Sequence, residues 1–410
     1  MSEPLVIIGN GMAAVRLVEE LGKNALGRYA IAVIGDEPRL AYNRVLLSSV
    51  LAREVSKAEI ELRPAQWWRD RGVTLLYGES AAAKAIDPAI RRVRLATGAT
   101  LPFSKLVIAT GSKPIRLNVP GMELPGVLTF RDLADVAAIE DAASGGRSAV
   151  VIGGGLLGLE AAYGLAKAGA RVTVVHLMDR LMERQLDPTA SAMLKNAVES
   201  KGIAVRLEAD TAAITGDGRV ETVHLKDGSA VAADLVVVAA GIRPNVDLAR
   251  AAGLDIGRGI LVDDHLQTSK HGIYAIGECA EHRGACYGLV EPAYEQARAL
   301  ASHLSGGDGA YRGSVLATNL KVSGVNLFSA GDFLGSPGTE QIVFTDPGLG
   351  SYKKLVIKGE KLTGCVLFGD THDGLWYLDL IRSGQSIETI RNDMMFGRAL
   401  AARAGKSVAA

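Results

Sequence analysis

The sequence predicts an α/β protein in which two parallel-sheet domains are followed by an antiparallel α+β domain. Three observations support this fold class. A glycine-rich turn occurs twice, after Ile8 and after Ile152, and each time it separates a short apolar run from a helical pattern. Strand and helix patterns alternate through about residue 305, which is typical of parallel sheets. The residues that follow show runs of alternating apolar and polar side chains, as antiparallel strands require.

The first glycine-rich turn contains Gly9, Gly11 and Ala14 after the apolar residues 5–8, and helical apolar spacing continues to Leu21. This G-x-G-x-x-A spacing between strand and helix is the pattern of a dinucleotide-binding Rossmann unit. The first glycine permits the tight turn, and the second leaves room for a pyrophosphate. The third small residue lets the helix pack against the strand. The helix then presents free N–H groups and a partial positive charge to the phosphates.

Two later segments are expected to complete this first site. The strand over residues 31–34 ends next to Asp36 and Glu37, and an acid at that place usually holds the two ribose hydroxyls. The residues alone do not decide between the two acids. A further strand leads to Thr110, Gly111 and Ser112, which we expect to cross close under the dinucleotide. A turn between domains is the alternative interpretation, and both can hold.

The second glycine-rich turn places Gly153, Gly155 and Gly158 after the apolar residues 150–152. A loop without a ligand is the alternative for either turn alone. Two intact turns in one chain predict two dinucleotides, and therefore an electron transfer between them. Glu160 follows on the same helix, where a partly exposed helix acid is the alternative to a role at the second dinucleotide.

The residues leave the choice of nicotinamide cofactor open. His176 follows the strand over residues 172–175, at the place where an acid would select the ribose of NADH. A histidine does not repel a 2′-phosphate, and Arg180 or Arg184 could attract one. A solvent-facing turn residue is the alternative interpretation of His176.

The two halves close alike, which indicates duplication of whole domains. Each ends in an apolar strand, a glycine turn and a proline, and Gly241 lies in the second of these turns. A glycine-rich linker at residues 306–309 ends the α/β part. The predicted domains are residues 1–118 with 244–308 for the first dinucleotide, 119–243 for the second, and 309–410 for the α+β domain, which closes in an alanine-rich helix over 397–410.

Composition narrows the function classes. Lysines plus arginines number 45, as do aspartates plus glutamates, so net charge gives no case for binding nucleic acid or an anionic membrane. No run of about 18 apolar residues occurs, so no membrane span is expected. The chain enters a strand directly, so we expect a cytoplasmic location. The three cysteines form no C-x-x-C pair, which argues against a redox-active disulfide and a cysteine-ligated iron–sulfur cluster.

Together these motifs resemble the FAD-dependent pyridine-nucleotide oxidoreductases, which share a glutathione-reductase-like fold. In that family the first turn binds FAD and the second binds NAD(P)H. Residues 268–278 are similar to the family motif T-x(n)-Y-A-x-G-D, with Glu278 in place of the flavin-binding aspartate. Residues 42–49 resemble the Y-D-R-P-P-L-S-K segment of ferredoxin and rubredoxin reductases, with Ser49 where those proteins have a lysine near the flavin.

A narrower resemblance covers essentially the whole chain. Residues 42–50, 153–160, 176–187 and 392–396 are similar to the N-terminal flavin half of the large subunit of assimilatory nitrite reductases. That family continues into cysteine-rich cluster and sirohaem domains, and this chain stops before them. The resemblance therefore implies a stand-alone electron-transfer component, similar to the NAD(P)H-oxidising subunit of assimilatory nitrate reductases, and it favours NADH.

The resemblance also implies roles for single residues. Arg44 is expected at the FAD pyrophosphate, where a guanidinium can form two parallel hydrogen bonds, with a surface arginine as the alternative. Glu291 begins a helix whose positive end would face the flavin C2 carbonyl, and Glu160 is the candidate near the nicotinamide. No catalytic acid or base and no metal site is assigned, because the flavin carries the chemistry. The expected FAD residues are Gly9, Gly11, Ala14, Asp36, Glu37, Arg44, Ser49, Thr110, Gly111, Arg131, Glu278 and Glu291. The expected NAD(P)H residues are Gly153, Gly155, Gly158, Glu160, His176, Arg184 and Gly241.

The implied function is an FAD-dependent NAD(P)H oxidoreductase that feeds electrons to a partner protein. A nitrate- or nitrite-assimilating enzyme is the first expectation for that partner, and a ferredoxin, a rubredoxin or a haem protein comes next. The alternative within the enzyme class is a self-contained reductase of oxygen, peroxide or a quinone, although no cysteine lies near Leu46 to support peroxide chemistry. A flavin-bound signalling or scaffold protein is the alternative from another class.

Overall fold

The computed structural model describes residues 2–25, 27–143, 146–322 and 324–401. The chain divides into two compact units. The first consists of Met1–Ile115, Arg131–Leu133 and Ile242–Ser314, and the second of Arg116–Phe130, Ala134–Gly241 and Val315–Ala410. The predicted three-domain boundaries stay a prediction, and each unit is described by itself.

A five-stranded parallel sheet with the order β19-β7-β1-β2-β3 forms the centre of the first unit. Ile8 at the end of β1 pairs with Ile34 on one side and with Ile108 on the other. The carboxyl ends of these strands therefore meet at one edge of the sheet. The strands are β1 (Glu3–Ile8), β2 (Tyr29–Ile34), β3 (Thr74–Leu76), β7 (Lys105–Ile108) and β19 (Ile273–Ala275).

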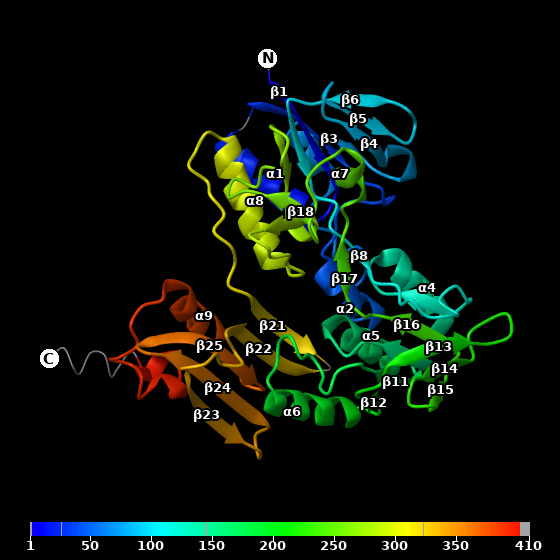
Figure 1. Cartoon of the computed structure of the whole chain (residues 1–410), viewed down its shortest axis with the longest axis vertical. Coiled ribbons are helices and arrows are strands. Elements are labelled where there is room, and N and C mark those ends of the chain that lie inside the picture. The colour runs from blue at the N-terminus through cyan, green and yellow to red at the C-terminus, as the bar shows by residue number, and fades with distance from the viewer. Residues whose placement is uncertain (1, 26, 144–145, 323, 402–410) are drawn as a thin grey trace. The chain divides into compact units, whose positions relative to one another are not determined.

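Both faces of this sheet are buried, which explains the continuous apolar run of β1. Leu5 and Ile7 belong to the core under helices α1 and α8, which pack against each other (Figure 1). Val6 and Ile8 belong to a second core on the opposite face. Trp68, in a short helix, is buried in the first core, as its apolar neighbours in the sequence suggest.

The helices and smaller strands of the first unit surround this sheet. Strands β4, β5 and β6 form an antiparallel sheet of their own. These elements are α1 (Met12–Asn24), η1 (Arg44–Leu46), α2 (Leu47–Leu51), α3 (Ala65–Asp70), η2 (Glu79–Ala81), β4 (Ala83–Asp87), β5 (Arg92–Leu95), β6 (Thr100–Pro102), β8 (Ser112–Pro114), β17 (Ile242–Pro244), α7 (Asp247–Ala251), β18 (Ile260–Val262), η3 (Gly277–Cys279), β20 (Ala280–His282) and α8 (Val290–Leu304).

The second unit repeats the same construction. Its parallel sheet has the order β12-β11-β10-β16-β9, and Ile152 at the end of β10 pairs with Val175 and with Val238. Helix α5 packs on β10 and β11 (Figure 1). The elements are β9 (Val127–Thr129), α4 (Leu133–Ala143), β10 (Ser148–Ile152), α5 (Leu156–Lys167), β11 (Arg171–Val175), α6 (Pro188–Glu199), β12 (Ala204–Arg206), β13 (Thr211–Thr215), β14 (Thr222–Leu225), β15 (Ala230–Ala232) and β16 (Leu235–Val238).

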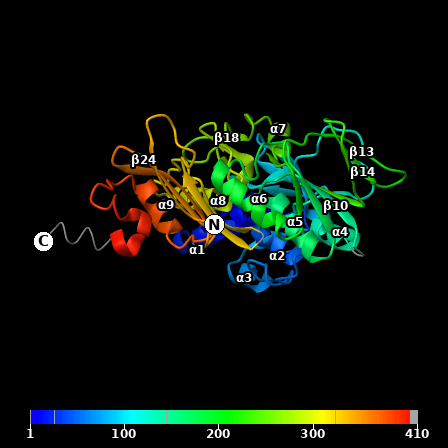
Figure 2. The ribbon, with the colours of Figure 1, turned by 90° about the horizontal axis from the view of Figure 1, so that it is seen from below.

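The rest of the second unit contains an antiparallel sheet with the order β21-β22-β25-β24-β23, as the alternating runs predict. Helix α9 packs on β22 and β25 of this sheet (Figure 1), and Figure 2 shows α9 beside the sheet from below. The elements are β21 (Ala317–Val322), β22 (Val325–Gly331), β23 (Glu340–Asp346), β24 (Ser351–Lys358), β25 (Lys361–Phe368), α9 (Gly374–Ser383) and η4 (Met394–Phe396).

These sheets confirm the predicted fold class of two Rossmann-like α/β domains and a C-terminal α+β domain. The predicted alanine-rich closing helix begins at Arg398 and is described only to Ala401, so its remainder lies outside the described residues. Across the ranges that the structure describes, no helix combines the length and the apolar character needed to cross a bilayer.

Candidate dinucleotide-binding sites

The two glycine-rich turns have the same geometry at their first glycine. Gly9 has φ +118° and Gly153 has φ +127°, a region that side-chain-bearing residues rarely adopt. A Cβ added to Gly9 would lie 2.1 Å from the carbonyl oxygen of Ala109, and one added to Gly153 would lie 2.3 Å from that of Ala239. Each turn therefore needs glycine twice over, for its backbone angle and for its approach to the neighbouring strand.

At the second glycine the requirement is different. A Cβ added to Gly11 or to Gly155 meets nothing within 4 Å. These residues are the N-caps of α1 and α5, and neither helix start has a side-chain cap among the described residues. The open space and the uncapped helix ends fit a phosphate group. The buried side-chain oxygen of Asn10 also has no hydrogen-bond partner among the described residues, so the first turn has polar capacity for a ligand.

The third small residue joins helix to strand in both turns. A Cβ on Gly158 would lie 1.9 Å from the carbonyl oxygen of Gly153, so α5 packs directly on the turn. Ala14 occupies the corresponding place on α1 and is fully buried. A small residue is therefore present at this third position in both units for the same steric reason.

Beside the first turn, the structure distinguishes the two acids that the sequence left open. Glu37 forms an ion pair with Arg44 and accepts a 2.7 Å hydrogen bond from the hydroxyl of Tyr42. The Arg44 guanidinium also donates to the carbonyl oxygen of Arg131 at 3.1 Å. Burial raises the pKa of Tyr42, so this hydroxyl stays protonated and donates. Asp36 is exposed, and it is Glu37 that belongs to the cluster.

A second cluster of the first unit gathers around Glu278. The hydroxyl of Ser112 donates to Glu278 Oε2 at 2.8 Å, and Arg131 forms an ion pair with the same carboxylate. Gly111 lies beside both, because a Cβ built on it would be 3.7 Å from Glu278 Oε2. Thr110 donates through its hydroxyl to the backbone at residue 245 instead. The structure therefore brings together Gly111, Arg131 and Glu278, as expected for one binding surface.

Tyr42 joins Glu37 and Arg44, and Ser112 joins Glu278. Tyr42 was not among the expected site residues, and its signal in the sequence was its place in residues 42–49, which resemble a reductase segment. Ser112 was expected only as part of the segment that would cross close under the dinucleotide. Ser49, by contrast, is half-buried on α2, and exposed Glu291 pairs with Arg298 at 3.0 Å in the first turns of α8.

His176, beside the second turn, is less exposed than a turn interpretation suggests. The ring of His176 is buried, with Nδ1 accepting a 3.0 Å hydrogen bond from the Gly154 N–H and Nε2 lying 3.2 Å from Glu183 Oε2. The side chain of Arg184 is 86% exposed, and Arg180 pairs with Asp179. His176 is thus a buried member of the turn rather than a solvent-facing residue.

The other two expected residues of the second site differ in exposure. Gly241 is exposed and has φ +112°, which parallels the positive φ of Gly111 in the first unit. Glu160 is half-buried near the start of α5. Both lie on elements that meet at the carboxyl edge of the second parallel sheet, where open α/β sheets bind their ligands.

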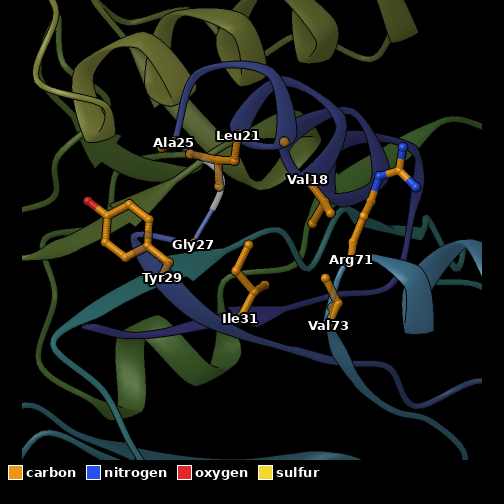
Figure 3. A pocket seen from close by; sticks show the side chains of 9 residues that line it. Val18, Leu21, Ala25, Gly27, Tyr29, Ile31, Arg71 and Val73 are labelled. Atoms are coloured by element: carbon orange, nitrogen blue, oxygen red, sulfur yellow. The ribbon is translucent and has the colours of Figure 1, made fainter. Parts of the chain in front are cut away.

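A small pocket of about 30 Å³ lies elsewhere in the first unit, between α1 and β2 (Figure 3). Its lining includes Leu21, Tyr29, Ile31 and Arg71. This volume has room for about one or two water molecules. The pocket adjoins the amino-terminal half of β2. The glycine turn lies at the opposite, carboxyl edge of the sheet, after β1, so the pocket has no part in a dinucleotide site.

Comparisons with known proteins agree with this geometry. Residues 3–299 match the model of the family described as pyridine nucleotide-disulphide oxidoreductase, and residues 317–385 match the rubredoxin NAD+ reductase C-terminal domain. The chain is 44% identical to the nitrite reductase [NAD(P)H] of Bacillus subtilis over 99% of its length and 50% of that protein's. It is 43% identical to the assimilatory nitrate reductase electron transfer subunit of the same species, covering 95% of this chain and 51% of that protein. The chain thus spans about half the length of these curated relatives.

Solved structures give the same result. A ferredoxin reductase from Rhodopseudomonas palustris superimposes with a TM-score of 0.87 at 28% identity, covering 98% of this chain and 100% of that one. The NADH:rubredoxin oxidoreductase from Clostridium acetobutylicum superimposes with a TM-score of 0.76 at 26% identity, covering 95% and 97%.

The duplicated turns and these matches define a flavin- and pyridine-nucleotide-dependent oxidoreductase. The chain belongs to the pyridine nucleotide-disulphide oxidoreductase family. Membership confirms the predicted enzyme class, and with it FAD and NAD(P)H as the cofactors of the family. All three cysteines lie in the described ranges and are free thiols, with Cys279 and Cys365 buried.

Proposed function

We propose that the first unit binds FAD at the Gly9 turn, that the second binds NAD(P)H at the Gly153 turn, and that the electrons pass to a nitrate- or nitrite-assimilating enzyme. The observation that carries this proposal is the repetition of one turn geometry in both units, each at the carboxyl edge of a parallel sheet. When bound, FAD accepts a hydride from the nicotinamide and can release electrons singly to a one-electron acceptor.

In the first unit, Gly11 and the start of α1 would hold the FAD pyrophosphate through backbone N–H groups and the helix dipole. Glu37 would accept hydrogen bonds from the ribose hydroxyls, and the hydrogen bond from Tyr42 holds its carboxylate in place. Arg44 would reach the pyrophosphate, since a guanidinium binds phosphate with two parallel hydrogen bonds. The present pairing of Arg44 with Glu37 keeps the cation beside the turn.

Glu278 would accept a hydrogen bond from a hydroxyl of the ribityl chain, as the aspartate at this position does in the family. Ser112 and Arg131 support that role, because they fix the carboxylate by a hydrogen bond and an ion pair. Ser49 and Glu291 remain weaker candidates for the flavin end of the site. Glu291 would act through the N-terminus of α8 rather than through its own carboxylate, which faces solvent and pairs with Arg298.

In the second unit, Gly153, Gly155 and Gly158 would admit the NAD(P)H pyrophosphate to the start of α5. Glu160 is the proposed residue near the nicotinamide, and Gly241 would lie close to the dinucleotide. NADH is the favoured donor. Arg180 or Arg184 would favour NADPH, because either could pair with a 2′-phosphate, although Arg180 already pairs with Asp179 and Arg184 is exposed.

The proposed partner follows from the relatives. One of them is named as an assimilatory nitrate reductase electron transfer subunit, and others as nitrite reductases. The C-terminal match to a rubredoxin reductase domain and a 36% identical rhodocoxin reductase keep a rubredoxin or ferredoxin as the second candidate. We favour the nitrogen-assimilating partner because those relatives match nearly the whole chain at higher identity.

The acceptor can be tested directly. The FAD-loaded protein is reduced anaerobically with NADH and mixed in separate stopped-flow runs with a nitrate reductase catalytic subunit, a ferredoxin, a rubredoxin, a quinone and oxygen. The proposal expects the fastest reoxidation with the nitrate reductase subunit. Fast reoxidation by oxygen or quinone alone would favour the self-contained reductase. A flavin that neither NADH nor NADPH reduces would favour a scaffold protein instead.

A further inference from the structure

The backbone hydrogen bonds identify equivalent positions around the two glycine turns. The N–H of Gly9 donates to Ile34 at 2.8 Å, and that of Gly153 donates to Val175 at the same distance. The next residues after those strands, Gly35 and His176, each donate to the neighbouring strand at 2.8 Å. Gly35 and His176 are therefore equivalent, and so are Asn10 and Gly154 within the turns.

In each unit a small space separates the glycine turn from the end of the neighbouring strand, and the two units fill this space from opposite sides. In the first unit the turn supplies the side chain: a Cβ on Gly35 would lie 2.7 Å from the Cβ of Asn10. In the second unit the strand end supplies it: a Cβ on Gly154 would lie 2.6 Å from the Cγ of His176. Each gap holds one side chain opposite one glycine, so His176 occupies the space that Asn10 occupies in the first unit.

His176 also satisfies the peptide group of the turn. Its Nδ1 accepts the Gly154 N–H at 3.0 Å, which requires that the ring proton be on Nε2. Glu183 Oε2, 3.2 Å from Nε2, accepts the hydrogen bond from the Nε2–H group and so favours this tautomer. The carbonyl oxygen of Gly154 in turn accepts the N–H of Met182 at 3.0 Å. One segment, from His176 to Glu183, thus holds Gly154 from both of its polar groups.

In this arrangement the His176 ring has no unengaged nitrogen with which to recognise a ribose. The residue is only 8% exposed, and both ring nitrogens are already engaged inside the protein. The residues that follow it, Leu177 and Met178, are 60% and 42% exposed and apolar, so they offer a 2′-phosphate no charge. The strand therefore ends in a histidine that supports the turn, at the position where an acid would otherwise select the ribose.

We propose that His176 is a positioning residue that holds the Gly154 peptide in its dinucleotide-binding geometry, with Glu183 fixing the tautomer, and that it does not discriminate NADH from NADPH. This inference rests on the proposed function, because it assumes that the Gly153 turn takes the nicotinamide dinucleotide. Loss of the imidazole would leave the Gly154 N–H without its acceptor and empty the space behind the turn. Affinity for both dinucleotides should then fall by the same factor.

The test compares His176→Ala, His176→Asn and Glu183→Leu in the FAD-loaded protein, with His224→Ala as the matched control. His224 lies on β14 in the same unit, and its ring is hydrogen-bonded to Thr215 at 2.8 Å. Calorimetric titration gives the dissociation constants of NAD+ and NADP+, and the FAD content and Tm report folding. We expect His176→Ala to weaken the binding of both dinucleotides by about 5- to 150-fold, the range for leaving a buried N–H unpaired.

The variants separate the possible outcomes. His176→Asn should recover most of the affinity, because its amide oxygen can accept near the position of Nδ1, and Glu183→Leu should weaken both dinucleotides by a smaller common factor. A change in the ratio of the two constants, or wild-type affinity in His176→Ala, would overturn the inference. If His176→Ala does not fold, the other two variants decide. A wild-type protein that binds neither dinucleotide would instead count against the proposed function.

Discussion

Tyr352 donates a 2.6 Å hydrogen bond to Asp187 across 165 residues of sequence, and both side chains are buried. Asp187 is the N-cap of α6 and also accepts the N–H of Ala190 at 3.0 Å. Lys354, on the same strand as Tyr352, places its ammonium 3.4 Å from the same carboxylate. The C-terminal sheet therefore contacts the segment that runs from the second glycine turn to α6, within one compact unit.

Removal of this hydroxyl tests how much the contact stabilises the unit. Tyr352→Phe should lower the free energy of unfolding by about 1–3 kcal/mol, because a buried carboxylate loses a donor. Urea unfolding followed by circular dichroism measures the change. Tyr77→Phe, at a residue that is 45% exposed, is the matched control. Equal stability of the two variants would show that the buried bond contributes nothing.

The two glycine turns should be separable by single substitutions. Gly9→Ala places a methyl group 2.1 Å from a backbone oxygen and should abolish FAD retention. Gly153→Ala creates the same clash in the second unit and should leave FAD bound while NAD(P)H binding falls by at least about tenfold. Bound flavin is measured by absorbance and dinucleotide affinity by titration. Gly22→Ala, where the added Cβ would be 3.9 Å from its nearest neighbour, should behave as wild type. Loss of flavin from Gly153→Ala alone would reverse the assignment of the two turns.

Glu278 should contribute to FAD affinity through its charge. Glu278→Gln keeps the shape but removes the negative charge that pairs with Arg131, so we expect about tenfold weaker FAD binding by the apoprotein. Glu278→Asp restores the carboxylate that the family uses and should bind more tightly than Glu278→Gln. Quenching of flavin fluorescence on binding measures both constants. Wild-type affinity in Glu278→Gln would remove this residue from the site.

Asp264 should give the first unit an acid-dependent stability. Hydrogen bonds from Arg283 at 2.6 Å and from His282 at 2.9 Å lower the pKa of Asp264 to about 2, from an ordinary 3.8. Because the folded-state pKa is lowered, the stabilisation is present above pH 3.8 and is lost as the pH falls towards 2. Asp264→Asn should lack this part of the pH dependence. Thermal unfolding of both proteins between pH 5 and pH 2 measures the difference, and parallel curves would contradict the assignment.

The sequence predicted what is decided locally. The turns at Gly9 and Gly153 could be predicted because a positive φ and a close strand crossing leave glycine alone at those positions. The sequence could not predict which of the two acids joins the cluster. Glu37 does so because Arg44 and Tyr42 reach its carboxylate, and its role at the ribose is a proposal.

Contacts that depend on tertiary packing were also beyond the sequence. Nothing local distinguishes a buried His176 bonded to Gly154 from a turn histidine, because its partners Gly154 and Glu183 are brought to the ring only by the folded turn. The bond between Asp187 and Tyr352 likewise joins two elements whose approach no spacing encodes. The family resemblance supplied Glu278 as a site residue, whereas its pairing with Arg131 required the folded structure.

The central claim is that a flavin bound at the Gly9 turn is reduced by a nicotinamide bound at the Gly153 turn. The most direct measurement is anaerobic stopped-flow absorbance of the FAD-loaded protein mixed with excess NADH. We predict rapid bleaching of the flavin in the wild-type protein and bleaching slowed by at least about tenfold in Gly153→Ala, with FAD still bound. Flavin that keeps its absorbance in the wild-type protein, or that bleaches equally fast in Gly153→Ala, would contradict the claim.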